Sequence, residues 1–306
     1  MGNTTIEWTN KVWNPVRGCS RVSEGCRNCY AEKVAARFSD EGQPFHLFAD
    51  RDKSGSKWTG KVELVKSRLD APLHWAKPRR IFVNSMSDLF HESLRAGQID
   101  KVFAVMSQCP QHIFQILTKR PERMLEYITA SAYVGVTDWA VDGIDEAAGN
   151  FGWFWPLPNV WLGVSVENQA MADARIPLLL RTRATKRFIS YEPALGPVDL
   201  GMWLYRRSSN SVTGGGLDWV ICGGESGPDA RPMRPDWARS IVAQCKAAGV
   251  ACFVKQMGAH IVGDPDEFPS AIHDSGDGHL TFHLCDRKGG DWLEWPEDLR
   301  VREFPS

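Results

Sequence analysis

The feature that most constrains the fold is a repeat of short apolar runs, each followed by a polar or glycine-rich turn and then by helical spacing. Such runs are typical of parallel strands that are buried on both faces under helices. The segments that begin with these runs and include the turns occupy residues 79–90, 112–124, 159–169, 186–197, 217–228 and 250–258. Helices are expected over residues 30–38, 97–108, 120–130, 168–182 and 235–248. Six or seven such units favour an α/β fold with a partial or complete parallel (β/α) barrel, a TIM-barrel variant, over a doubly wound sheet.

The barrel is expected to span residues 1–258. Two stretches do not follow the repeat and are expected to be insertions, near residues 39–66 and 131–158. Long excursions from a compact domain are usually lids, binding loops or disordered segments. From residue 259 to 306, strand-like runs joined by a Gly-Gly turn predict a small C-terminal β extension packed on the barrel.

Composition excludes several classes of protein. The net charge of −1 gives no global basic field for nucleic acid or membranes. No run of about 18 apolar residues or signal peptide is present, so no membrane association is expected and the expected compartment is the cytoplasm. The lack of a Ser-His-Asp ordering and of a His-Glu-x-x-His motif counts against hydrolases. The lone His46 and His91 are candidates for proton transfer, although a lone histidine is more often structural.

Three of the eight cysteines, Cys19, Cys26 and Cys29, lie close together near the start of the chain. Disulfides are rare in reducing compartments, so thiols or metal ligands are expected. The two-residue gap between Cys26 and Cys29 lets both thiolates bind one centre, as in zinc and iron-sulfur sites. A structural zinc site requires a fourth ligand, for which Cys222 is the best candidate. Three thiolates without an evident fourth fit a four-iron cluster with one open iron better than zinc.

Polar residues follow five of the strand-like runs, at the end of a barrel where active sites lie. These residues are Asn84, Ser85, Ser87 and Asp88; Thr118, Lys119 and Arg120; Ser165 and Glu167; Ser190 and Glu192; and Gly223, Gly224 and Glu225. Serine, asparagine, aspartate and glycine also form helix caps and turns, so each cluster alone has a structural alternative. Together they predict a ligand site.

The cations at these strand ends predict an anion site for substrate. Lys119 and Arg120 follow one run, and Arg231 and Lys255 extend the basic rim. Arginine suits bidentate contact with a carboxylate or phosphate, and a basic rim suits a nucleic-acid backbone. The alternative for Arg120 is that it simply opens the next helix.

The carboxylates and glycines at the strand ends also have two interpretations. Glu167 and Glu192 either bind ribose hydroxyls or a cationic substrate, or form ion pairs with Lys119, Arg120 or Arg231. The 223–227 turn, Gly-Gly-Glu-Ser-Gly, either frees backbone N–H groups for a ligand or is a packing turn.

The motifs as a set resemble a known family. They are "NPVRGCSRVSEGCRNCYAEK", "NSMSDLFH", "ILTKRPERM", "LGVSVEN", "SYEPALGPV" and "GGESGPDARPM". Across about residues 5–258 the chain is similar to a phage- and prophage-associated three-cysteine family of uncharacterised function, usually grouped with the radical S-adenosylmethionine superfamily. The chain departs from the usual superfamily pattern in two ways. Six residues separate the first two cysteines, which is more than is usual. The Gly-Gly-Glu lies at residues 223–225 and not at the second strand, so its usual role of holding the amino group of the cofactor is not transferred to Glu225.

The resemblance implies a function. Cys19, Cys26 and Cys29 would hold a [4Fe-4S] cluster whose open iron binds S-adenosylmethionine, and an external electron donor would reduce it. The product is a 5′-deoxyadenosyl radical that modifies or repairs a substrate, expected to be a nucleic acid or nucleotide. Candidate cofactor-binding residues are Asn84, Ser85, Ser87, Asp88, Ser165, Glu167, Glu192, Gly223, Gly224 and Glu225. The alternative is a non-catalytic, nucleic-acid-associated protein that uses zinc or an iron-sulfur cluster for structure.

Overall fold

The computed structural model describes residues 4–52, 55–133, 155–205, 215–273 and 281–306. The chain divides into two compact units. The first unit comprises residues Met1–Val164 and Arg181–Lys186, and the second comprises Ser165–Leu180 and Arg187–Ser306. Most of the insertion expected at 131–158 lies outside the described residues.

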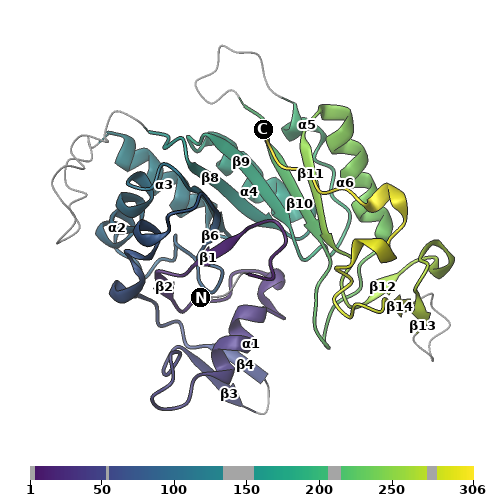
Figure 1. The fold of residues 1–306 in the computed structure, drawn as a ribbon, viewed down its shortest axis with the longest axis horizontal. Helices are drawn as coiled ribbons and strands as arrows, with labels where there is room; N and C mark the ends of the chain where they lie inside the picture. Colours follow the sequence, from purple (N-terminus) through teal and green to yellow (C-terminus); the bar gives the residue numbers. More distant parts are fainter. Residues whose placement is uncertain (1–3, 53–54, 134–154, 206–214, 274–280) are drawn as a thin grey trace. The chain divides into compact units, whose positions relative to one another are not determined.

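Seven strands carry the α/β repeat (Figure 1). They are β1 (Lys11–Trp13), β6 (Arg80–Val83), β7 (Ile113–Thr118), β8 (Val160–Val166), β9 (Lys186–Tyr191), β10 (Trp219–Gly223) and β11 (Ala251–Gln256). Their hydrogen-bonded order is β1-β6-β7-β8-β9-β10-β11. The pairs β1–β6, β6–β7, β7–β8, β9–β10 and β10–β11 are parallel. The predicted parallel α/β sheet is confirmed, and its open strand order fits the partial form of the barrel.

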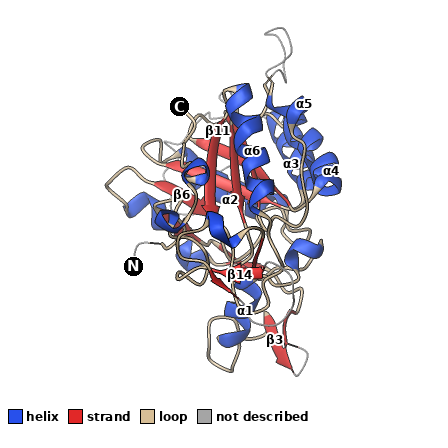
Figure 2. Ribbon diagram, turned by 90° about the vertical axis from the view of Figure 1, so that its right-hand side faces the viewer, coloured by secondary structure: helices blue, strands red, loops and turns tan. Residues whose placement is uncertain are grey.

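Burial explains why these strands lack an alternating pattern. Every residue of β8 and of β10 is buried. A strand covered on both faces needs apolar or small residues at every position, and this is why its sequence is a continuous apolar run. In the second unit, helix α6 (Pro235–Ala248) packs on β10 and β11 (Figure 2).

All five expected helices are present, with ends that shift by at most a few residues. They are α1 (Tyr30–Arg37), α2 (Ala96–Ser107), α3 (Pro121–Tyr133), α4 (Gln169–Arg181) and α6. One further short helix, α5 (Gly201–Leu204), was not expected. Helix α6 has Pro235 in its first turn, and Gly249 caps its end with a φ of 66° in the left-handed region. None of the described helices is both long and apolar enough to cross a lipid bilayer.

The insertion near residues 39–66 is folded. Strands β3 (Ala49–Asp52) and β4 (Gly55–Trp58) form an antiparallel hairpin that packs on α1. Buried Ala35, Ala36 and Ala49 make the contact, together with partly buried Phe45 and Trp58. Strand β5 (Glu63–Leu64) then pairs with β2 (Val16–Arg17), which directly precedes the three cysteines.

The C-terminal segment forms the expected small β extension. Strands β12 (Ile261–Val262), β14 (Thr281–His283) and β13 (Ile272–His273) form an antiparallel sheet in that order. The last residues return to β11, where the Val254 N–H donates to the Val301 carbonyl at 2.8 Å and the Glu303 N–H to the Cys252 carbonyl at 2.8 Å. The tail thereby pairs with backbone groups of an edge strand, a common way to protect such an edge.

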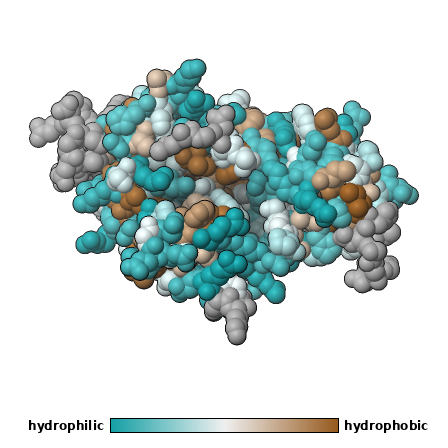
Figure 3. Space-filling model, turned by 60° about the horizontal axis from the view of Figure 1, so that its bottom comes forward, coloured by the Kyte–Doolittle hydropathy of each residue, from teal (hydrophilic) through white to brown (hydrophobic). Residues whose placement is uncertain are grey.

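The remaining regular segments are short 3₁₀ helices. They are η1 (Glu24–Cys26), η2 (Lys66–Arg68), η3 (Ala71–His74), η6 (Pro265–Glu267), η7 (Trp292–Glu294) and η8 (Glu297–Leu299). The face drawn in Figure 3 is mostly hydrophilic, with hydrophobic residues scattered among polar ones. Single exposed apolar residues of this kind are normal on a folded protein.

Candidate metal centre and strand-end site

The three cysteines lie on one loop, residues 18–30, called the cysteine loop below. Gly18 begins it with a φ of 87°, and a Cβ added there would lie 2.0 Å from the Lys61 carbonyl oxygen. Only glycine fits both the backbone angle and this close approach. The loop then forms η1, which contains Cys26, and ends with Cys29 as the residue that caps the N-terminus of α1.

All three thiols are free and partly buried. Burial raises the pKa of the Cys19 thiol to about 12; Asp88 adds to the rise, whereas Arg120 opposes it. Burial also raises the pKa of Cys29, and backbone amides at the start of α1 oppose that rise. The thiols of Cys19 and Cys29 are therefore protonated at neutral pH until a metal ion or another positive charge favours the thiolate.

The chemistry of these donors fits a thiolate-bound metal centre. Three free thiols share one loop, and neighbouring thiols interact: Cys29 adds to the rise in the pKa of Cys19, and Cys26 adds to the rise in the pKa of Cys29. Among the described residues, no group of three or more Cys, His, Asp or Glu side chains is arranged to hold a metal ion. The loop therefore supplies suitable ligands, and its sulfur atoms must move together to complete a site.

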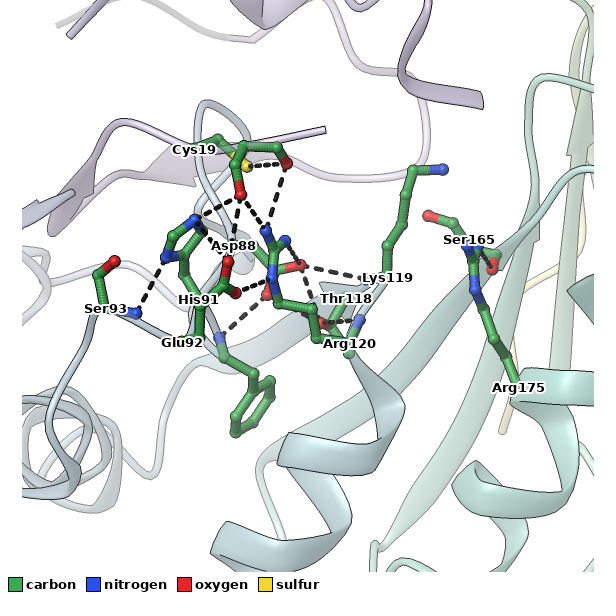
Figure 4. A network of polar contacts seen from close by, with 12 residues as sticks. Cys19, Asp88, His91, Glu92, Ser93, Thr118, Lys119, Arg120, Ser165 and Arg175 are labelled. Atoms are coloured by element: carbon green, nitrogen blue, oxygen red, sulfur yellow. Dashed lines mark hydrogen bonds and ion pairs between the residues drawn. The ribbon is translucent and has the colours of Figure 1, made fainter. Parts of the chain in front are cut away.

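A buried polar network lies beside Cys19 (Figure 4). Arg120 is 7 % exposed, and its Nη2 donates to the Ser20 carbonyl at 3.2 Å and to Ser20 Oγ at 2.7 Å. Its Nε donates to Glu92 Oε2 at 2.7 Å and its Nη1 to Asp88 Oδ2 at 3.2 Å. Although burial opposes it, these two carboxylates raise the pKa of Arg120. The predicted substrate-binding residue Arg120 is thus buried in contact with the cysteine loop.

Asp88 holds this network to the strand ends. Its two carboxylate oxygens accept from Thr118 Oγ1 at 2.8 and 2.9 Å, and from the backbone N–H groups of Lys119 at 3.1 Å and Phe90 at 3.0 Å. Asp88, which was predicted to bind a cofactor, joins the segments that follow β6 and β7 in the structure. The Lys119 side chain points away from the network in Figure 4, so Lys119 is the better candidate for contact with substrate.

His91 has a structural position in the same network. Its Nδ1 accepts from the Ser93 backbone N–H at 3.1 Å, so the neutral ring carries its proton on Nε2, which lies 2.8 Å from Ser20 Oγ. Burial, and then Arg120, lower the pKa of His91. A neutral ring that donates to Ser20 cannot also accept the Ser20 proton, which supports the structural interpretation of this histidine.

Asn84, directly after β6, has an unusual backbone and an unusual side chain. Its φ is 62°, in the left-handed region that asparagine tolerates better than most residues. Its Oδ1 accepts from the Val16 backbone N–H at 3.3 Å, and its Nδ2 is buried without a hydrogen-bond partner among the described residues. Asn84 was predicted to bind a cofactor. Its oxygen already accepts one hydrogen bond, and the group without a partner among the described residues is a donor.

The two serines of this turn fix the base of the cysteine loop. Ser87 Oγ donates to the Val16 carbonyl at 3.0 Å, and Ser85 Oγ donates to Asn14 Oδ1 at 3.2 Å. At the other end of the loop, the Tyr30 hydroxyl donates to the Ser85 carbonyl at 2.7 Å. Both serines were predicted to bind a cofactor, and in the structure both contact segments next to the cysteines.

Sequence reasoning missed the contact of the loop with the hairpin. Glu32 is 1 % exposed and accepts from Arg21 Nη2 at 2.5 Å and from the Trp58 backbone N–H at 2.7 Å. This carboxylate therefore joins the cysteine loop, α1 and β4. The only signal in the sequence is a glutamate in the first turn of a helix, which is common because of the helix dipole.

In the second unit, the predicted carboxylates form ion pairs. Glu167 is 1 % exposed and lies 3.1 Å from Arg175 Nη1, which also donates to the Ser165 carbonyl at 2.8 Å (Figure 4). Glu192 forms an ion pair with Lys255. The ion-pair alternative is therefore supported, although the partners differ from those expected. Arg175 was missed because it lies inside a helix and away from any strand end.

The Gly-Gly-Glu turn of the second unit is tightly packed. A Cβ on Gly224 would lie 2.3 Å from the Met257 carbonyl oxygen, and the Gly224 N–H donates to the Gln256 carbonyl at 2.9 Å. Glu225 accepts from Arg231 through its backbone N–H at 2.9 Å and through Nη2 at 2.8 Å. These contacts support the packing alternative for Gly224, and Gly223 immediately precedes it at the end of β10.

Comparisons with known proteins give one match. The family described as "Protein of unknown function (DUF5131)" matches residues 3–286. The comparisons with curated proteins and with solved structures give no match.

Proposed function

We propose, for a chain that belongs to the DUF5131 family of unknown function, that Cys19, Cys26 and Cys29 bind a [4Fe-4S] cluster in a radical S-adenosylmethionine enzyme. The observation that supports this proposal most is the cysteine loop itself. It carries three free thiols and is tied to the ends of parallel strands by Ser20 and Tyr30. A set of three protein thiolates leaves one iron of a four-iron cluster open for a further ligand.

When bound, the cluster would supply one electron to S-adenosylmethionine; the C5′–S bond would break to give methionine and a 5′-deoxyadenosyl radical, which would remove hydrogen from a substrate. The residues of this chain have to hold the cluster and exclude water. The three thiols are already withdrawn from solvent in part, and Arg120 places a positive charge beside Cys19 that favours the thiolate. An external donor supplies the electron.

The proposed cofactor contact of the first unit is Asn84. Its Nδ2 is a buried donor with no partner in the described part of the chain, and an unsatisfied donor of this kind costs roughly 1–3 kcal/mol. An acceptor oxygen of the cofactor would restore that hydrogen bond after a local shift of the turn. For the substrate we propose a nucleic acid or nucleotide, with Lys119 as its phosphate contact.

Anaerobic reconstitution of the full chain with iron and sulfide tests the proposal. We expect about four irons per chain, absorbance from thiolate-to-iron charge transfer, and release of 5′-deoxyadenosine on reduction with S-adenosylmethionine. Alanine at Cys19, Cys26 or Cys29 should abolish the full cluster. Alanine at the exposed Cys285 is the matched control and should leave it intact.

The same experiment also tests the alternative function. If the purified protein retains zinc and does not cleave S-adenosylmethionine, the alternative function is favoured, that of a non-catalytic, nucleic-acid-associated protein that uses zinc for structure. A full cluster in any of the three loop variants would remove that cysteine from the ligand set.

A further inference from the structure

We propose that Arg120 is a positioning residue, which holds the cysteine loop beside Cys19 in place, so that a local movement is enough to bring the sulfur atoms together around a metal centre. The role toward a cluster rests on the proposed function, whereas the contact with the loop rests on the geometry alone. Arg120 was predicted from the sequence to bind an anionic substrate, so this inference assigns the residue a different task.

The contact with the loop is direct and specific. Ser20 follows Cys19, and Arg120 Nη2 donates to both oxygens of Ser20, the carbonyl at 3.2 Å and the hydroxyl at 2.7 Å. His91 Nε2 lies 2.8 Å from the same hydroxyl. A hydroxyl oxygen has two lone pairs. Arg120 and His91 can therefore fix Ser20 from two sides, and with it the backbone next to the first cysteine.

The guanidinium is itself held rigidly. Glu92 accepts from its Nε and Asp88 from its Nη1, on atoms that do not contact the loop. Asp88 is fixed in turn by the Thr118 hydroxyl and by backbone N–H groups at the ends of β6 and β7. The position of Ser20 is thus set by the parallel strands through an unbroken chain of hydrogen bonds.

Arginine suits this position better than lysine. The planar guanidinium directs five donor hydrogens in fixed directions, whereas an ammonium group is a compact point charge on a flexible chain. Only arginine can contact Glu92, Asp88 and both oxygens of Ser20 at once. A lysine keeps the positive charge near Cys19 but loses this fixed geometry, which separates the two effects experimentally.

Holding the loop in advance makes metal binding less costly. Residues that are already ordered lose less conformational entropy when they bind. The loop is held near Cys19 by Arg120 and near Cys29 by the Tyr30 hydroxyl, with Cys26 on η1 between them. The final approach of the three sulfur atoms then requires a local movement and not the folding of a disordered segment.

Hydrogen exchange on the metal-free full chain tests the positioning role. In Arg120→Met and in Arg120→Lys we expect the amides of residues 18–23 to exchange at least about tenfold faster than in the wild type. The matched control is Arg239→Met. Arg239 pairs with Asp236, Glu267 and Asp298 in the second unit, and its loss should leave exchange in the loop unchanged.

A second measurement uses the reconstituted protein. Transfer of iron from the cluster to a chelator should be at least about tenfold faster in both Arg120 variants than in Arg239→Met. The midpoint potential of the cluster should fall in Arg120→Met and stay close to the wild-type value in Arg120→Lys, which keeps the charge.

Two results would overturn the inference. One is unchanged exchange over residues 18–23 in both Arg120 variants. The other is faster exchange that is uniform over the whole chain, because this indicates global destabilisation. If the wild type binds no iron, the proposed function fails, and hydrogen exchange still decides whether Arg120 holds the loop.

Discussion

Two glycines allow the geometry of the cysteine loop to be tested. Gly18 and Gly60 have φ values of 87° and 85°, but only Gly18 has an atom close to the position of an added Cβ. Alanine at either position should lower the free energy of unfolding by about 1–2 kcal/mol, because a residue with a Cβ is strained at a positive φ. Gly18→Ala should lose at least ~2 kcal/mol more, because its Cβ would meet the Lys61 carbonyl. Urea denaturation measures the difference, and equal losses in the two variants would contradict this account.

His91 makes a pH-dependent contribution to stability. Its pKa in the folded protein is below the usual value of 6.5, so the unfolded chain binds more protons below that pH. Stability should therefore fall as the pH drops from about 7 to about 5.5. Burial alone would raise the pKa of Glu92, but its hydrogen bond with Arg120 lowers this pKa to about 2. The contribution of Glu92 to stability is therefore lost only as the pH falls below about 4.5.

The variant His91→Gln should reduce this pH dependence, because glutamine retains a donor toward Ser20 and does not titrate. Thermal unfolding at several pH values compares it with the wild type. An equally steep fall in both proteins over this pH range would show that another group is responsible.

Residue types at the strand ends were predictable, but their partners were not. The sequence placed Glu167, Glu192 and Asp88 at the ends of strands, where the structure has them. It did not indicate Arg175 as the partner of Glu167, since ion-pair partners depend on how a helix rotates against its strand. A buried donor without a hydrogen-bond partner among the described residues, such as Asn84 Nδ2, cannot be predicted from the sequence either.

At the level of elements, the hairpin depends on one buried carboxylate. Glu32→Ala removes the acceptor for Arg21 and for the Trp58 N–H, and should cost about 3 kcal/mol, at the lower end for a buried pair because Arg21 is partly exposed. Hydrogen exchange should rise over residues 49–58. The control Glu41→Ala, at an exposed position, should change neither quantity. A hairpin that stays equally protected in Glu32→Ala would show that apolar packing alone holds it.

The hairpin also shows why the insertion was not recognised as regular structure. Its strands contain Asp50, Arg51 and Lys57, and they lack the alternating apolar pattern of a typical strand. They are stable because they pack on α1, which is a tertiary effect. Helix α6 was predictable to the residue because Pro235 and Gly249 mark its ends locally.

On the scale of the molecule, the strand-and-helix repeat was sufficient to predict a parallel α/β sheet. The return of the C-terminal tail to β11 was not predictable in detail, because pairing with an edge strand requires no local pattern. The division into two compact units was not evident either, since one boundary falls within β8 and leaves no change in composition.

The central claim is that three cysteines hold a cluster with one open iron. Electron paramagnetic resonance of the reduced, reconstituted protein tests it most directly, before and after addition of S-adenosylmethionine. We predict a [4Fe-4S]⁺ signal whose g values shift when the cofactor binds the open iron, and loss of that signal in Cys19→Ala, Cys26→Ala and Cys29→Ala. A signal that S-adenosylmethionine leaves unchanged, or the absence of any cluster signal in the wild type, would contradict the account.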